Sequence, residues 1–155
     1  TRYFAHHGFN VLAVDLPGKG LAAARGIHPL EIDIAADDAP DRVVLAAVKS
    51  LGGIDILFNN AGVSGRWKIE EITDAQWDRT FAVNVRAPFR IARAAVPELK
   101  KSPAGRIINT ASVMAESADL GLAAYCGSKA GVAGLTRVLA LELGKHGITA
   151  NYIMP

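Results

Sequence analysis

The apolar residues of this chain fall in short continuous runs, separated by longer segments with helical periodicity. Runs of this kind are typical of parallel strands buried on both faces. We expect strands at residues 10–16, 28–34, 54–60, 105–112 and 147–154. We expect helices at residues 37–52, 73–102 and 122–147. The alternation predicts an α/β fold, a doubly wound parallel sheet in a single domain over residues 1–155.

The stretch DLPGKGLAAARG that follows the first run contains Gly18, Gly20 and Ala23 in the pattern G-x-G-x-x-A. This pattern is typical of turns that bind the pyrophosphate of dinucleotides. Only about seven residues separate Gly20 from the next strand near His28, whereas a crossover connection needs at least about ten. We therefore interpret the glycines as turn residues.

Asp15 ends the same strand and favours the same interpretation, because a carboxylate there would repel a pyrophosphate. At the end of the second strand of a dinucleotide-binding unit, an acidic residue accepts hydrogen bonds from the adenosine ribose and disfavours a 2′-phosphate. Asp15 thus predicts NAD rather than NADP as the cofactor. The first strand and its glycine turn would then be missing from the chain, and TRYFAHHG (residues 1–8) would be the end of the helix after them.

Composition narrows the classes of function. A formal charge of +2 without clustered basic residues argues against nucleic acid as a partner, and no apolar run is long enough for a membrane span. The single cysteine, Cys126, permits no internal disulfide, so we expect a reducing, cytoplasmic location. His6, His7 and His28 lack a ligand pattern, so we expect no metal site.

Tyr125 and Lys129 are four residues apart, so they share one face of the predicted helix 122–147. A phenol is a poor acid–base group at neutral pH, and a nearby ammonium favours its phenolate form. By itself the pair also fits a tyrosine packed beside a surface lysine. Ser112 precedes Tyr125 by thirteen residues and ends a predicted strand, at the sheet edge where open α/β folds bind ligands.

Further motifs accompany this pair in a specific order. They are NNAG at residues 59–62, Asn84 within AVNV, Ser112, the Tyr-x-x-x-Lys pair and NYIMP at residues 151–155. Together they resemble the short-chain dehydrogenase/reductase family over essentially all of the chain, with NYIMP in place of the family's N-x-x-x-P-G. The resemblance implies a Rossmann-like fold that is incomplete here, with the first and the last strand missing.

The resemblance implies roles for the catalytic residues. Tyr125 would be the general acid/base, giving a proton to a carbonyl oxygen or taking one from an alcohol. Lys129 would favour the phenolate and hold the nicotinamide ribose, and Ser112 would orient the substrate oxygen. Pro155 would begin the segment that lies against the nicotinamide.

The same resemblance implies contacts on the adenosine side of the cofactor. Asp33 and Ile34 would meet the adenine ring. The adenosine side would be lined by Asn60, Ala61 and Gly62.

Asn84 can also be read from backbone chemistry. Pro88 has no N–H for the carbonyl four residues earlier, so we expect a free carbonyl and a kink at Asn84. In the family this Asn holds a water of a proton relay that runs to the Lys. The alternative is a simple proline kink with the Asn84 side chain turned outward.

These features predict an NAD-dependent oxidoreductase that interconverts a secondary alcohol and a ketone. One alternative is a sugar-nucleotide epimerase or dehydratase of the extended branch, and another is a non-catalytic NAD-binding scaffold. The family often assembles through the helices at 73–102 and 122–147, so we expect a homodimer or homotetramer. With strands missing at both ends, we expect these 155 residues alone to bind NAD poorly, to aggregate and to be inactive.

Overall fold

The computed structural model describes residues 1–155 and places one strand at each of the five apolar runs, with β2 beginning one residue before the expected 28–34. The strands are β1 Val11–Asp15, β2 Ile27–Glu31, β3 Ile56–Asn59, β4 Arg106–Thr110 and β5 Thr149–Ile153. All neighbouring strands pair in parallel. The predicted α/β architecture with parallel strands is confirmed.

The helices also follow the expected order along the chain. The α-helices are α1 Arg2–His6, α2 Ala39–Leu51, α3 Asp74–Phe81, α4 Ala87–Leu99 and α5 Ala123–Leu143. Short 3-10 helices follow at η2 Val113–Ala115 and η3 Gly144–His146. Thr73 caps α3 through a hydrogen bond from the Gln76 N–H to its hydroxyl oxygen, as its position before the helix predicts.

The expected single helix over 73–102 is wrong in its details. A π-helical segment, η1 Ala82–Arg86, separates α3 from α4. The Ala87 N–H bonds to the Ala82 carbonyl, five residues back, and Pro88 follows. Because Pro88 cannot donate a hydrogen bond, the wider turn lies at the position where the proline predicts a disruption.

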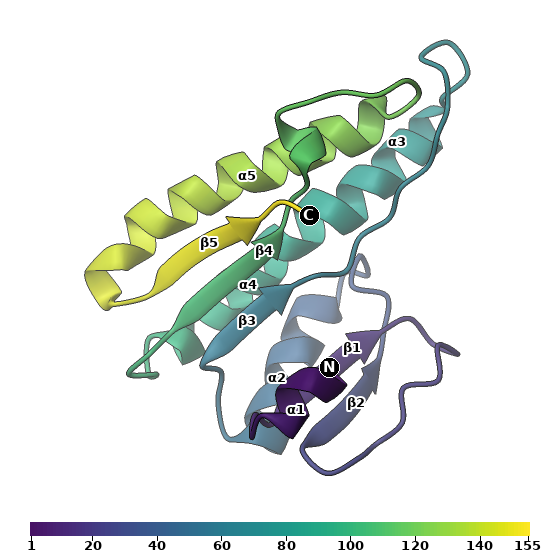
Figure 1. Cartoon of the computed structure of the whole chain (residues 1–155). Helices are drawn as coiled ribbons and strands as arrows, with labels where there is room; N and C mark the ends of the chain where they lie inside the picture. The colour runs from purple at the N-terminus through teal and green to yellow at the C-terminus, as the bar shows by residue number, and fades with distance from the viewer.

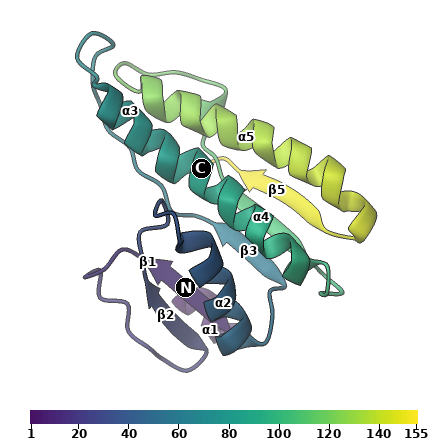
Figure 2. The same ribbon diagram turned by 180° about the vertical axis from the view of Figure 1, so that it is seen from behind.

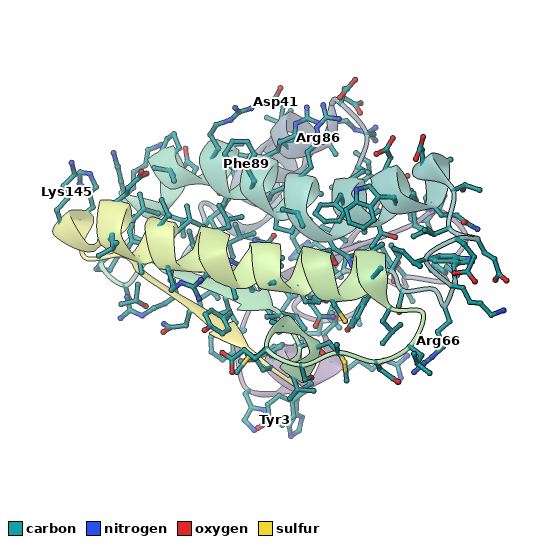
Figure 3. All side chains as sticks on the ribbon, turned by 90° about the horizontal axis from the view of Figure 1, so that it is seen from above. Tyr3, Asp41, Arg66, Arg86, Phe89 and Lys145 are labelled. Atoms are coloured by element: carbon teal, nitrogen blue, oxygen red, sulfur yellow. The ribbon has the colours of Figure 1, made fainter.

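The helices lie on both faces of the strands. Figures 1 and 2 show α2, α4 and α5 on one face and α1 on the other. In the view from above, Tyr3 of α1 projects on the side opposite Asp41 of α2 and Phe89 of α4 (Figure 3). The chain is therefore wound on both faces of its sheet layer, as expected of a Rossmann-like fold.

The strands form two sheets rather than one. β1 pairs only with β2, and β4 lies between β3 and β5, so no backbone ladder joins β1 to β3. The connection between β1 and β2 has no helix, and Gly18 and Gly20 adopt φ of +77° and +69° there. These glycines are turn residues, as expected, because a phosphate-binding turn needs a helix to follow it.

Two apolar clusters lie between the helices and the sheets. The larger one joins α4 and α5 to β4 and β5 and contains Ala92, Ala95, Leu99, Ile107, Leu143, Ile148 and Ala150. The smaller one joins α2 and α4 to the segment after β2 and contains Ile32, Ala39, Val43 and Ile91. Leu57 of β3 packs against both clusters and so links the two sheets.

Candidate active site

The carboxyl ends of β3, β4 and β5 bring together residues that are far apart in the sequence. Asn60 follows β3, and its side-chain oxygen accepts a hydrogen bond from the Thr110 hydroxyl at 3.1 Å. Ser112 follows β4 and is 7% exposed. Its hydroxyl donates to the carbonyl oxygen of Pro155, after β5, at 3.4 Å. Parallel strands place their carboxyl ends at one edge, so all three predicted site residues lie there.

The first turns of α5 place Tyr125 and Lys129 at this edge. The Lys129 Nζ lies 5.6 Å from the centroid of the Tyr125 ring. It donates a hydrogen bond of 2.6 Å to the carbonyl oxygen of Thr110, the last residue of β4. This bond fixes the ammonium beside the phenol through the sheet backbone rather than through a carboxylate.

The side chain of Lys129 is buried, with 5% of its surface exposed. Burial disfavours the ammonium form, so the pKa of Lys129 lies below its ordinary value. No salt bridge offsets this cost. A buried ammonium held by one carbonyl oxygen has spare N–H donors. Because an unpaired buried charge costs stability, its presence makes this position a candidate functional site.

Asn84 lies in the π-helical segment and points inward, so the alternative of an outward side chain is wrong. It is 2% exposed. Its Oδ1 accepts from the Val63 N–H at 2.8 Å, and its Nδ2 donates to the Val63 carbonyl at 2.9 Å. The same Nδ2 donates to Ser128 Oγ at 3.0 Å. Asn84 therefore fastens the loop after β3 to the helix that carries Tyr125 and Lys129.

The loop Asn60–Gly62 borders the same space and is exposed to solvent, Ala61 included. A Cβ placed on Gly62 would lie 3.5 Å from Lys129 Nζ and 3.4 Å from Asn84 Oδ1. The absence of a side chain at Gly62 thus leaves the ammonium within reach of a group that approaches from the loop side.

The remaining predicted residues lie beside the other sheet. Asp15 is exposed at the end of β1, and only its Oδ1 is engaged, by the Leu16 N–H at 2.8 Å. Asp33 follows β2 and accepts from the Ala35 N–H at 2.9 Å. That bond, more than the salt bridge to Arg79 at 2.9 Å, keeps the pKa of Asp33 below its ordinary value. Ile34, beside Asp33, is half-buried.

Sequence reasoning missed two participants in this geometry. Thr110 supplies the carbonyl for Lys129, and Ser128, fully buried, joins Asn84 to the carbonyl of Tyr125 through its hydroxyl. The position of Ser128, three residues after Tyr125 and one before Lys129, could have indicated a buried hydroxyl on the catalytic side of the helix. A backbone carbonyl such as that of Thr110 leaves no signal in the residue types.

Comparison with known proteins identifies the family of this chain. A family model described as short chain dehydrogenase matches residues 1–155. The chain belongs to the short-chain dehydrogenase/reductase family. It is 42% identical over 128 residues to a D-beta-hydroxybutyrate dehydrogenase of Rhizobium meliloti, covering 83% of this chain and 49% of that relative.

Other members of the short-chain dehydrogenase family are similarly close. The human dehydrogenase/reductase SDR family member 4 is 36% identical over 141 residues, covering 90% of this chain and 49% of the relative. A short chain dehydrogenase from Mycobacterium smegmatis superposes with a TM-score of 0.79 at 32% identity, over 83% of this chain and 54% of that one. The chain spans about half the length of the relatives named here.

Two further findings concern ligands and membranes. No three His, Cys, Asp or Glu side chains are grouped so that they could hold a metal ion. None of the helices combines the length and the apolar character that a membrane span needs. Dehydrogenases of this family use a nicotinamide cofactor, and the residues present offer donors and acceptors suited to its ribose hydroxyls: the spare N–H groups of Lys129 and the free carboxylate oxygen of Asp15.

Proposed function

We propose that the protein containing this chain is an NAD-dependent dehydrogenase that interconverts a secondary alcohol and a ketone. The observation that carries this proposal is the Lys129 ammonium, buried and bonded to the Thr110 carbonyl within 5.6 Å of the Tyr125 ring. In this proposal the cation would stabilise the negative charge that the Tyr125 oxygen carries during the reaction. Two of the relatives are named D-beta-hydroxybutyrate dehydrogenases, and their named substrate is a secondary alcohol, which supports this substrate class.

The cofactor would lie across the two sheets. Lys129 would hold the nicotinamide ribose, with Pro155 and Tyr125 beside it. Asp15 would accept hydrogen bonds from the adenosine ribose and disfavour a 2′-phosphate, which is our reason for NAD over NADP. Asp33 and Ile34 would contact the adenine, and the adenosine side would be lined by Asn60, Ala61 and Gly62. A nicotinamide cofactor held by these residues would supply the acceptor for the hydride of the alcohol carbon.

The protein's own residues would orient the substrate oxygen and transfer its proton. The Ser112 hydroxyl would hold the substrate oxygen toward Tyr125, whose phenolate oxygen would take the hydroxyl proton during oxidation. In the reverse direction the phenol would return that proton to the ketone oxygen. Asn84, through its backbone carbonyl, would hold a water that links Lys129 to solvent, so that the proton on Tyr125 is released during oxidation and replaced during reduction.

The test is turnover of secondary alcohols and ketones with NAD or NADH, for the full-length protein and its Tyr125→Phe variant. We expect the variant to lose activity by a factor of at least about 100, because the proton has no acceptor. The control is Cys126→Ser, since residue 126 points about 100° away around α5. If Tyr125→Phe retained near wild-type activity, the proposed mechanism would be wrong.

We further propose that the helical face of α3, α4 and α5 forms a homo-oligomer interface, giving a homodimer or homotetramer. An open hollow of about 590 Å³ lies there. Its lining is mainly apolar and includes Phe81, Val85, Phe89 and Leu135. Phe89 is 41% exposed, and Figure 3 shows it on the outer side of α4. Exposed aromatic residues around a hollow are typical of protein interfaces.

Phe89→Asp tests this interface, because it places a charge in the hollow. We expect the variant to elute at a smaller mass than the wild type in size-exclusion chromatography with light scattering. The matched control is Leu45→Asp on α2, where the native side chain is 69% exposed outside the hollow. An unchanged mass for Phe89→Asp, or an equal loss with Leu45→Asp, would contradict the interface.

A further inference from the structure

A line of side-chain hydrogen bonds, buried from β4 onward, runs from β3 across β4 into the middle of α5. Asn59 Nδ2 donates to Asn109 Oδ1 at 2.8 Å, and Asn109 Nδ2 donates to Thr136 Oγ1 at 2.8 Å. The Thr136 hydroxyl in turn donates to the Val132 carbonyl at 2.7 Å. Asn109 and Thr136 are each 1% exposed. We refer to Asn59, Asn109 and Thr136 as the amide–hydroxyl line; none of them belongs to the site described above.

The line permits one orientation of its groups. The single hydroxyl hydrogen of Thr136 is donated to Val132, so its oxygen must accept from Asn109. The Asn109 amide therefore turns its nitrogen to α5 and its oxygen to β3. No buried side-chain nitrogen or oxygen lacks a partner. A shift of α5 along β4 would leave the Asn109 amide buried and unpaired, and such groups are costly.

The helix α5 needs a directional contact of this kind. The residues between Lys129 and Thr136 include Ala130, Gly131, Ala133 and Gly134. Small side chains give a helix shallow ridges, so packing alone defines its axial position poorly. A buried polar pair can specify register where apolar packing does not.

The same helix face carries the site. Asn109 directly precedes Thr110, whose carbonyl holds the Lys129 Nζ. Thr136 lies seven residues after Lys129, two helical turns along and on nearly the same face. Two hydrogen bonds thus attach one face of α5 to consecutive residues of β4.

We propose that Asn109 and Thr136 are positioning residues, which set where α5 sits on β4 and thereby hold the Lys129 ammonium and the Tyr125 ring at the site. This proposal rests on the proposed dehydrogenase function. The line does not touch the reacting groups and acts through the placement of Lys129.

Thr136→Val in the full-length protein tests the proposal, because valine has the shape of threonine without its hydroxyl. We expect kcat to fall by about tenfold to a hundredfold, since small misplacements of catalytic groups have effects of this size. We expect the half-maximal rate of alcohol oxidation to need a higher pH, since a displaced Lys129 no longer favours the phenolate. Thr136→Ser keeps the hydroxyl and should restore both kcat and the pH profile.

The matched control is Val132→Ala, which removes volume from the same buried face and leaves the hydrogen bonds intact. It should lower Tm without moving the pH profile. An unchanged profile in Thr136→Val, or an equal displacement in Val132→Ala, would overturn the proposal. Should Thr136→Val not fold, Thr136→Cys, with a weaker hydrogen-bonding group, should give an intermediate displacement, and the absence of one would also overturn it.

A structural measurement separates failure of this proposal from failure of the proposed function. If the wild type has no activity on alcohols or ketones, the dehydrogenase proposal fails. Crystal structures of the wild type and Thr136→Val would still show whether Thr136 sets the position of α5 on β4. We expect α5 displaced along β4 and the Lys129–Thr110 hydrogen bond lost in the variant; α5 in its wild-type position would contradict the role.

Discussion

The two sheets carry their candidate functional residues in different ways. Beside β3–β4–β5, Asn84, Ser112 and Lys129 are buried, whereas Asn60–Gly62 and Pro155 are exposed. Asn84 is held by a hydrogen bond to Ser128, and Lys129 by one to the Thr110 carbonyl. In β1–β2 the candidate Asp15 is exposed and bonds only to the next residue's N–H. The candidate residues Asn84 and Lys129 are therefore held by hydrogen bonds beside β3–β4–β5, whereas Asp15 presents its carboxylate to solvent.

The boundary between the sheets explains part of this difference. β3 pairs on one side only, and its Ile56 and Phe58 are 44% and 37% exposed. Phe58 meets Phe4 of α1 edge-on, with ring centroids 6.2 Å apart. The sheets are thus linked by side chains and by α2–α4 packing, not by backbone hydrogen bonds. In the proposed function, Tyr125 and Lys129 beside β3–β4–β5 would carry out the chemistry, and Asp15 after β1 would select the nucleotide.

The largest expected effect comes from Lys129→Met, which removes the buried cation of α5 beside β4. Activity should fall at least about 100-fold. The free energy of unfolding should stay equal or rise by about 1 kcal/mol, since an apolar side chain no longer carries the cost of burying a charge. Steady-state kinetics and urea unfolding of the same preparation measure both; a large loss of stability would contradict the functional interpretation.

The pH dependence of this pair follows from the lowered pKa of Lys129. Above that lowered value and up to the ordinary value of 10.5, the unfolded chain keeps the proton that the folded chain has lost. Wild-type stability relative to Lys129→Met should therefore rise with pH through this window and be lowest below it. A difference that stays constant with pH would contradict the burial cost.

Truncating one apolar side chain in each sheet should lower the free energy of unfolding by different amounts. Ile107 of β4 has no exposed surface, and Ile107→Ala should cost about 2–5 kcal/mol. Leu12 of β1 is only half-buried, and Leu12→Ala should cost about 1 kcal/mol. Equal losses in denaturant unfolding would mean that β1–β2 is packed as tightly as the catalytic sheet.

The preference for NAD over NADP should change only with substitutions at the β1–β2 sheet. Asp15→Ser should lower the ratio of kcat/KM for NAD over NADP by roughly tenfold to a hundredfold, the equivalent of losing a charged hydrogen bond. Stability should not change, because the side chain is exposed. Glu31→Gln, at the end of β2, is the control. An unaltered cofactor ratio in Asp15→Ser would exclude the role proposed for Asp15.

The smallest effect is expected from the salt bridge between Arg79 and Asp33, whose side chains are 45% and 38% exposed. Solvent screens such pairs, so Arg79→Gln should cost less than about 0.5 kcal/mol at neutral pH. The lowered pKa of Asp33 contributes stability above 3.8 that is lost as the pH falls below it, and its main cause, the Ala35 N–H, stays in the variant. Acid unfolding should therefore shift little.

Much of this geometry could be predicted from local patterns. Continuous apolar runs located all five strands, and Pro88 predicted the disruption that the π-helical segment shows. The spacing of Tyr125 and Lys129 placed both side chains on one face of α5, and the crossover length identified Gly18 and Gly20 as turn residues. These features depend on backbone chemistry within a few residues, which the sequence displays directly.

The contacts that hold α5 against β4 and the loop after β3 could not be predicted in this way. Asn84 bonds Val63 and Ser128, and Asn109 bonds Thr136, across 21, 44 and 27 residues. Which polar groups meet depends on how α5 docks on β4, and no local period encodes that docking. The division of 73–102 into three helical segments was missed because periodicity does not distinguish an α-turn from a π-turn.

The most direct test of the central claim is to follow the hydride from the alcohol substrate to the nicotinamide cofactor. A secondary alcohol that the full-length protein oxidises would be labelled with deuterium at its carbinol carbon, and reduced NAD would be isolated after one turnover. The account predicts that the deuterium is found at C4 of the nicotinamide in the wild type and that Tyr125→Phe forms little labelled cofactor. Deuterium released to water, or ketone formed without deuterium in the nicotinamide, would contradict it.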